Sequence, residues 1–317
     1  MTVESPAVHG IRPAAGAGSR SPACSGPRHY RVGPVPITLI CDVPGVVREF
    51  HACYRRYQID VPPPDAFRIE VISRRSPRSL RRYHHIRGNG EPLFVTRRPD
   101  EIMPHVEWAI NSLVARFLPG YLSIHASCVA RGGRGVIFPA EPGRGKSTLA
   151  AGLLAAGWSY LSDEFALFDL RSGLLVPYPK ALCIKAGSFA VLEALGLPLQ
   201  GAPVHHKRYK GRVAIVDPFA IRRDVVSGPC PAGAVVFPRY VEGAAPRLER
   251  ISRARAIFEL TRVSFNFPKY RAFGFELLAD AVAQAECFEL TAGELPATVR
   301  LLEATLAAVP AAGRQTG

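Results

Sequence analysis

The chain has 317 residues, of which 48% are hydrophobic, and 40 basic against 26 acidic side chains give it a formal net charge of +14. This length and apolar content exclude a fibrous or wholly disordered protein. The charge comes mostly from arginine, whose planar fork suits phosphates and other oxyanions. Seven scattered cysteines without a CxxC spacing favour reduced thiols in a cytoplasm over a zinc site or a disulfide framework.

Both ends of the chain are predicted to be tails. Residues 1–29 are rich in Pro, Gly, Ala and Ser without periodicity, which predicts a disordered tail that contains no signal peptide. Residues 311–317 are expected to form a short second tail. No uncharged run is long enough to span a bilayer, so we expect no membrane segment.

Residues 30–100 are predicted to form a small α+β accessory domain. Residues 32–40 and 67–71 have the composition and alternation of strands. Between them, Asp42 followed by Pro44 predicts an N-cap and first turn of a helix, whose apolar residues then recur at helical spacing.

An arginine-rich stretch covers the end of this region. Residues 68–98 hold nine arginines and only two acids, with aromatic residues interleaved. Such a mixture can grip nucleic acid, which leaves a nucleic-acid-stimulated ATPase as an alternative. Because no nucleic-acid-binding signature accompanies the stretch, we favour a solvated face beside a phosphate-using site, and a nucleic-acid partner is disfavoured.

The rest of the chain, residues 101–310, is predicted to be an α/β core with C-terminal helices. A helix over residues 103–117 precedes two strand-like runs, 121–130 and 134–138, which Gly132-Gly133 joins in a tight hairpin. If Arg131 faces Arg134, counting back along the ladder places His125 opposite Ala140.

Residues 140–147, AEPGRGKS, match GxxxxGK[ST] except at the first position, where Ala140 replaces Gly. A strand precedes this motif and a helix, residues 147–156, follows it, so the context predicts a P-loop with inward-facing backbone N–H groups. Lys146 would reach the outer phosphates and the Ser147 hydroxyl would complete a Mg²⁺ shell. The expected nucleotide-binding residues are Gly143, Arg144, Gly145, Lys146, Ser147 and Thr148.

An acidic pair, Asp163-Glu164, follows the next predicted strand, residues 158–161. The short spacing from Ser147 predicts that this strand lies beside the P-loop strand. One carboxylate can then serve the metal while the other removes a proton from an acceptor hydroxyl. The alternative is that one of these acids only caps the following segment.

Taken together, the segments IHAS, PAEPGRGKST, GW and LSDE resemble the HPr kinase/phosphorylase family, and more closely the bacterial HPr kinase-related kinase A group. The resemblance extends through VEWAIN, PYPKALCIK, KGRVAIV, VVFPRY and SFNF, and covers most of residues 30–310. It implies a P-loop kinase core that binds ATP and makes a phosphoserine on a protein or peptide. HPr-binding members have Asp-Asp in place of Asp163-Glu164 and a downstream glycine-rich signature not found here, so HPr and phosphorolysis are not expected.

The sequence therefore predicts an ATP- and Mg²⁺-dependent kinase that phosphorylates a serine of a small protein or peptide, with homo-oligomers possible. The alternative from another class is a non-catalytic nucleotide-sensing module. The predicted catalytic residues are Asp163 as general base, Lys146, and His125 polarising the γ-phosphate or assisting proton transfer. The predicted metal residues are Ser147, Asp163 and Glu164.

Further charged residues are open to two interpretations. Lys185, Lys210 and Arg212 could neutralise the transferring phosphoryl group, although solvated side chains are favoured. His205-His206 is predicted to lie in a loop. After a strand over residues 234–237, helices are expected near 253–263 and 274–285, and a capping box at Thr291–Glu294 is expected to begin a last helix. These C-terminal elements are expected to carry no chemistry.

Overall fold

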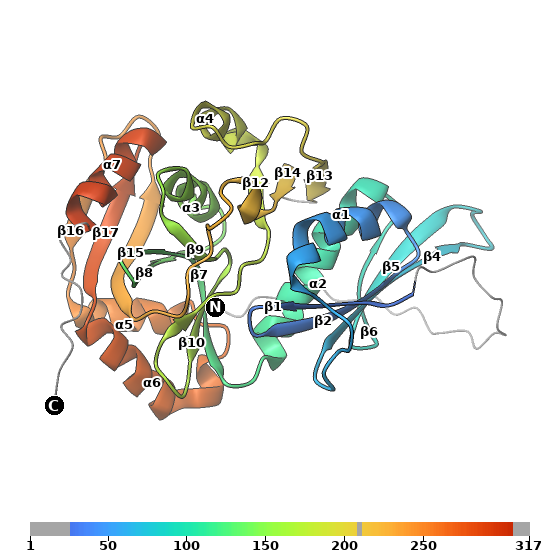
Figure 1. The fold of residues 1–317 in the computed structure, drawn as a ribbon, viewed down its shortest axis with the longest axis horizontal. Helices are drawn as coiled ribbons and strands as arrows, with labels where there is room; N and C mark the ends of the chain where they lie inside the picture. Colours follow the sequence, from blue (N-terminus) through green and yellow to red (C-terminus); the bar gives the residue numbers. More distant parts are fainter. Residues whose placement is uncertain (1–25, 208–210, 307–317) are drawn as a thin grey trace.

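The computed structural model describes residues 26–207 and 211–306 (Figure 1). It is a mixed α/β structure with two large sheets and one small one. Residues 1–25 of the predicted tail 1–29 and the whole predicted tail 311–317 lie outside the described residues. The end of the first tail was wrongly predicted, since Arg28 and His29 pair with a neighbouring strand. The N-terminal sheet has the strand order β3-β1-β2-β4-β5-β6. Its strands are β1 (Arg28–Val32), β2 (Val35–Cys41), β3 (Gln58–Ile59), β4 (Phe67–Arg75), β5 (Arg82–Gly88) and β6 (Glu91–Thr96).

The first hairpin differs from the single strand predicted over residues 32–40. Strand β1 already begins at Arg28, and the chain reverses between β1 and β2, where Val32 pairs with Val35. Gly33 makes this turn possible because its φ of +55° lies in the region that L side chains rarely adopt. Apolar residues alternate on both sides of the turn, so the pattern resembles one continuous strand and does not reveal the turn.

Helix α1 (Pro44–Tyr54) begins at the predicted proline, but Asp42 is not its N-cap. The capping position belongs to Val43, which makes no side-chain capping bond. The Asp42 carboxylate instead accepts hydrogen bonds from the backbone N–H of Ser73 at 2.6 Å and from its hydroxyl at 2.9 Å. Asp42 therefore joins the start of α1 to strand β4.

Helix α2 (Ile102–Phe117) confirms the predicted helix and lies against the N-terminal sheet. Its apolar side packs with β4, β5 and β6, and one buried cluster includes Ile69, Ile86 and Val106. The same cluster continues into the central part of the molecule through Phe165 and Tyr178. The division of the chain at residue 100 stays a prediction, and the two halves share apolar packing across it.

A buried ion pair also joins the two halves. The Lys180 ammonium lies 3.3 Å from the carboxylate of Glu107 on α2, and both side chains are less than a tenth exposed. Tyr54 donates to the same carboxylate at 2.8 Å and accepts from the backbone N–H of Ala181 at 3.1 Å. Burial alone would lower the pKa of Lys180, but the charge of Glu107 and of more distant acids raises it above its usual value.

Loss of one partner of this pair should be costly. We expect Lys180→Met to reduce the free energy of unfolding by about 3–5 kcal/mol, because Glu107 would remain buried without its cation. Arg68→Ala, which breaks the exposed pair with Glu70, should cost about 0–1 kcal/mol. Adding Glu107→Gln to Lys180→Met should recover part of the loss in urea titrations. Equal effects of Lys180→Met and Arg68→Ala would contradict this account.

The central sheet has the strand order β11-β10-β7-β8-β15-β17-β16, and β9 pairs with β7 beside β10. Strands β8, β15 and β17 are mutually parallel, whereas β7 is antiparallel to β8. The hairpin at Gly132-Gly133 and the pairing of Arg131 with Arg134 are confirmed. The strands are β7 (Tyr121–Arg131), β8 (Arg134–Pro139), β9 (Ser159–Ser162), β10 (Phe165–Asp169), β11 (Leu175–Val176), β15 (Ala232–Tyr240), β16 (Arg247–Arg250) and β17 (Glu286–Ala292).

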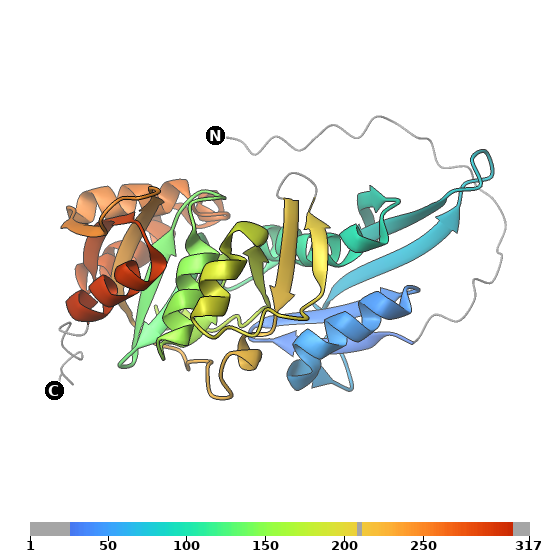
Figure 2. The ribbon, with the colours of Figure 1, turned by 90° about the horizontal axis from the view of Figure 1, so that it is seen from above.

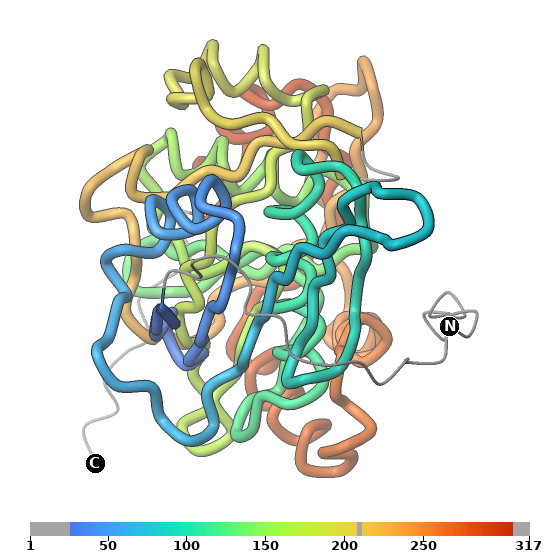
Figure 3. The backbone as a smooth tube through the Cα atoms, turned by 90° about the vertical axis from the view of Figure 1, so that its right-hand side faces the viewer, coloured from blue at the N-terminus to red at the C-terminus, as the bar shows by residue number. Residues whose placement is uncertain are grey.

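Helices cover both faces of the central sheet (Figure 1). Helices α3 (Lys146–Ala155) and α7 (Leu295–Leu306) pack on the face that includes Phe138, Val236 and Leu290. Helices α5 (Arg253–Arg262) and α6 (Phe267–Ala283) pack on the opposite face. Figure 3 views the molecule from the side of the N-terminal sheet, whose blue and teal segments lie in front.

A small third sheet lies between the two halves (Figure 2). It consists of β12 (Leu182–Lys185), β13 (Val204–Lys207) and β14 (Gly211–Val216), in the order β12-β14-β13. Helix α4 (Phe189–Ala194) follows β12. Strand β12 contacts α3 of the central part, and β13 contacts α2 of the N-terminal part.

Two sequence predictions about this half were wrong. Strand β9 pairs with β7 and not with β8, the strand before the glycine-rich loop, because β15 already occupies the other edge of β8. Thr291 is not an N-cap, since it lies within β17 and pairs with Arg239 and Arg247. Helix α7 begins four residues later at Leu295, and the carbonyl of Glu294 accepts from the Thr298 backbone.

Across the described ranges, no helix combines the length and the apolar character needed to cross a membrane. All six cysteines in these ranges are free thiols.

Candidate functional site

The glycine-rich loop, residues 140–145, connects the end of β8 to the start of α3. Gly143 and Gly145 have φ angles of +94° and +87°, which explains why the sequence has glycine at both positions. The backbone N–H of Leu149 donates to the carbonyl of Gly145 at 2.9 Å as the first turn of α3 forms. The backbone N–H groups of this first turn lie at the positive end of the helix dipole, an arrangement suited to anions.

Lys146, the first residue of α3, is buried under this loop. Its ammonium donates to the carbonyl oxygens of Ala140 at 2.5 Å and Glu141 at 3.2 Å. The same nitrogen lies 3.3 Å from Nε2 of His125 on β7. The predicted position of His125 at the mouth of the loop is therefore confirmed by this contact.

Asp163 lies behind the first turn of α3. Its Oδ1 accepts from the hydroxyl of Ser147 at 3.0 Å and from that of Ser127 on β7 at 2.5 Å, and Asp163 is only 3% exposed. Strand β7 brings these groups together because it lies between β8, which leads into the loop, and β9, which ends beside Asp163.

This set of oxygen atoms fits Mg²⁺. Hydroxyl and carboxylate oxygens are hard donors, and Mg²⁺ usually binds one or two protein ligands together with phosphates and water. In the part of the chain that the structure describes, no group of three or more His, Cys, Asp or Glu side chains gathers into a metal site. Ser147 and Asp163 therefore suit a metal shared with a phosphate ligand better than a metal held by protein alone.

Glu164 points to a different place from Asp163. Its Oε1 lies 3.4 Å from Nε2 of His125, and its side chain is one-third exposed. Its φ of +90° is rare for a residue with a side chain, and it turns the chain between β9 and β10, which both pair with β7. This turn separates the two carboxylates of the acidic pair.

A cavity of about 640 Å³ opens above the loop and the first turn of α3. Its lining includes His125, Glu164, Lys146 and Ser147, whereas Asp163 lies beneath this surface. All six predicted nucleotide-binding residues line it, namely Gly143, Arg144, Gly145, Lys146, Ser147 and Thr148. The structure thus brings the sequence-predicted residues to one place.

A basic wall borders the cavity on the side of the small sheet. Lys185, at the end of β12, is exposed and lines the cavity, and its ammonium approaches Gly143. Lys207 of β13 lies on the same wall and donates to the Cys183 thiol at 3.7 Å. Arg212 is exposed on β14 and is not part of the lining, and Lys210 lies outside the described residues.

Sequence reasoning missed several residues of the lining. Ser188, whose Oγ lies 2.6 Å from Oγ1 of Thr148, comes from the segment after β12. Further lining residues come from the ends of β15 and β17 and from the start of α7, in the region predicted to carry no chemistry. The signal for them was available, because ligands of open α/β sheets bind beyond the carboxyl ends of parallel strands. They are Pro238, Tyr240, Ala292, Gly293, Glu294, Leu295, Pro296 and Thr298.

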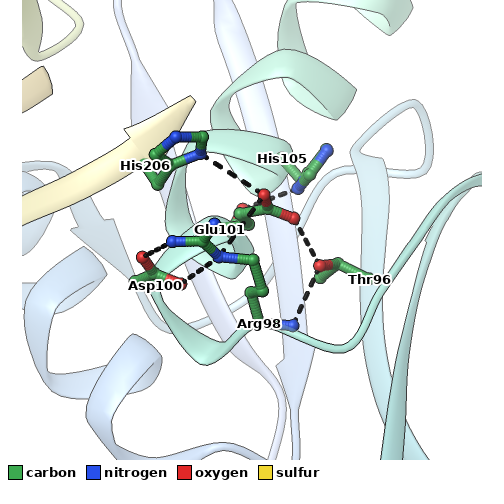
Figure 4. A network of polar contacts seen from close by, with 6 residues as sticks. All are labelled: Thr96, Arg98, Asp100, Glu101, His105 and His206. Carbon is green, nitrogen blue, oxygen red and sulfur yellow. Dashed lines mark hydrogen bonds and ion pairs between the residues drawn. The ribbon is translucent and has the colours of Figure 1, made fainter. Parts of the chain in front are cut away.

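The histidine pair lies on strand β13 and not in a loop, because its backbone pairs with β14. His205 forms an ion-pair contact with Glu49 of α1, and His206 Nδ1 lies 3.5 Å from Glu101. Figure 4 shows the second contact within a network in which Thr96 also donates to Glu101, at 2.5 Å. These histidines connect β13 to the N-terminal part of the molecule.

The arginine-rich stretch spans strands β4, β5 and β6, and most of its arginines lie on the β4–β5 hairpin, which extends away from the core (Figure 2). Among the described residues that line the cavity, none comes from residues 68–98. The expectation of a basic face beside the phosphate site was therefore wrong in its position, since the hairpin carries these side chains outward. Its exposed arginines near the tip are Arg74, Arg75, Arg78, Arg81 and Arg82.

Comparison with known proteins gives matches among solved structures but none at the level of sequence. No protein-family model and no curated protein matches this sequence. Among solved structures, the HPr(Ser) kinase/phosphatase from Coxiella burnetii matches 58% of this chain and 93% of its own length, with 15% identity and a TM-score of 0.26. An identity and a TM-score this low assign no function to the chain.

Proposed function

We propose that the protein is an ATP-dependent phosphotransferase that moves the γ-phosphate of ATP to a serine hydroxyl of a protein or peptide. The observation that supports this proposal is the convergence of five side chains at one cavity above the start of α3. Lys146, His125 and Glu164 line that cavity, and Ser147 and Asp163 are hydrogen-bonded to each other at its base.

The loop and Lys146 are proposed to bind the triphosphate. The backbone N–H groups at the start of α3 offer donors for phosphate oxygens, and Lys146 supplies a buried cation next to them. Ser147 and Asp163 would hold Mg²⁺, which when bound neutralises charge on the phosphates. Lys185 and Lys207 on the basic wall add positive charge where a phosphoryl group would pass.

The two carboxylates are proposed to have different roles. The sequence alone favours Asp163 as the general base. Its burial and its hydrogen bonds with Ser147 and Ser127 favour a role as a metal ligand instead. Glu164 is more exposed, lines the cavity and contacts His125. We therefore assign to Glu164, with His125 beside it, the removal of the proton from the acceptor hydroxyl.

The choice of a protein or peptide serine as the acceptor rests on the sequence resemblance to HPr kinase-like enzymes. Lys185 and Lys207 line the cavity, and their positive charge favours an acceptor that carries acidic side chains near its serine. A non-catalytic sensing module would need the loop, but it would not need an acid and a histidine facing the cavity.

Phosphate transfer can be measured directly. We expect the protein with Mg²⁺ and γ-labelled ATP to label serine-containing peptides, and to prefer those with acidic neighbours over those with basic ones. Matched peptides with alanine in place of serine should stay unlabelled. Tight ATP binding without transfer to any peptide, protein or water would contradict the proposal and favour nucleotide sensing.

A further inference from the structure

A second wall of the cavity, formed by the ends of β15 and β17 and by the start of α7, carries aromatic and apolar side chains. It includes Pro238 and Tyr240 at the end of β15, Ala292 at the end of β17, and Leu295 and Pro296 at the start of α7. Strand β15 is the parallel neighbour of β8, so its end lies next to the glycine-rich loop. A molecule whose phosphates lie on that loop would have its remaining part close to this wall.

Tyr240 is the most exposed large hydrophobic side chain of this wall, at 57%. Side chains alternate along a strand, and Val236 of β15 packs with α3. Pro238 and Tyr240 continue that row past the first turn of α3. The Cβ of Tyr240 lies 3.7 Å from the point where Gly145 would carry a Cβ, so Tyr240 stands directly beside the loop.

The position of Tyr240 is fixed by its backbone neighbours. The N–H of Val241 donates to the carbonyl of Ala292 at 2.8 Å, which ties the end of β15 to the end of β17. Gly293 lies so close to Ala244 that a Cβ at Gly293 would fall 1.8 Å from the Ala244 carbonyl oxygen. The wall is therefore preformed, while across residues 26–207 and 211–306 no other aromatic ring packs on Tyr240.

We infer that Tyr240 is a stacking platform for the base of the bound nucleotide, and that the wall formed by the ends of β15 and β17 is the nucleoside site. This inference rests on the proposed function, in which the triphosphate lies on the loop. An exposed ring beside apolar side chains suits the flat face of a purine. Glu294, exposed on the same wall, offers a carboxylate to the hydroxyls of a ribose.

Calorimetry with two ligands separates the base from the phosphates. MgATP has both, whereas inorganic tripolyphosphate with Mg²⁺ has only the phosphate chain. We expect Tyr240→Ala to weaken MgATP binding by about tenfold, the scale of one lost stacking contact, and to leave tripolyphosphate binding unchanged. Tyr240→Phe should bind both like the natural protein, because the ring is kept. Phe258→Ala, at a 62% exposed ring on α5, is the matched control and should bind both normally.

Unchanged MgATP affinity in Tyr240→Ala would overturn the inference, and so would an equal loss for both ligands. Tyr240-dependent ATP binding in a protein that transfers no phosphate would support the nucleoside site and overturn the proposed function alone. A natural protein that binds neither ligand would overturn both.

Discussion

Lys146→Ala should reduce MgATP affinity and phosphate transfer by about a hundredfold or more each, since it removes the buried cation beside the proposed phosphate site. The Lys146 ammonium donates to the backbone carbonyls of Ala140 and Glu141, so the loop backbone fixes its position. Calorimetry would measure the affinity, and label transfer to a peptide would measure the rate.

The control for this prediction is Lys269→Ala on α6, which removes one lysine from the opposite face of the sheet. It should leave both quantities unchanged, so net charge cannot explain the effect of Lys146→Ala. Thermal unfolding of the Lys146 variant would show whether the fold is intact. Unchanged MgATP affinity in a folded Lys146→Ala protein would exclude the loop as the phosphate site.

The second large effect is expected at the acidic pair. Glu164→Gln keeps the size of the side chain but removes its basicity, so transfer should fall by about 10²- to 10⁴-fold while MgATP affinity is kept. Asp163→Asn should lower MgATP affinity as well as transfer, because Asp163 is bonded to Ser147 on the metal side.

Comparing the two variants tests how the carboxylates divide their roles. Glu91→Gln, at an exposed residue of β6, is the matched control and should behave like the natural protein. If Asp163→Asn lost transfer but kept MgATP affinity, and Glu164→Gln remained active, Asp163 would be the base. That result is the one the sequence alone predicts.

Local patterns predicted much of this site. The loop, its helix and the hairpin before it depend on neighbouring residues, such as Gly132-Gly133, Gly143 and Gly145, whose φ angles only glycine adopts easily. The register of that hairpin was enough to predict that His125 lies near the glycine-rich loop, where it contacts Lys146.

The failures came from contacts between distant segments. Strand β9 lies beside β7 because β8 has β15 at its other edge, a pairing that no short motif encodes. Thr291 matches a capping box, but its place in the ladder between β15 and β16 decides its structure. The sequence did not predict the role proposed for Tyr240, because that role depends on β15 being the neighbour of β8.

Strand β13 connects the cavity to the far half of the chain. Its consecutive residues His205, His206 and Lys207 contact α1, Glu101 before α2, and the cavity in turn. A shift of Lys207 would therefore have to break or carry along two contacts with the N-terminal half. The contacts of His205 and His206 with the N-terminal half therefore help to hold Lys207 of the basic wall in place. A fragment that starts at residue 119 would keep the loop and the acidic pair, but it would lose Glu49 and Glu101 and with them the support of that wall.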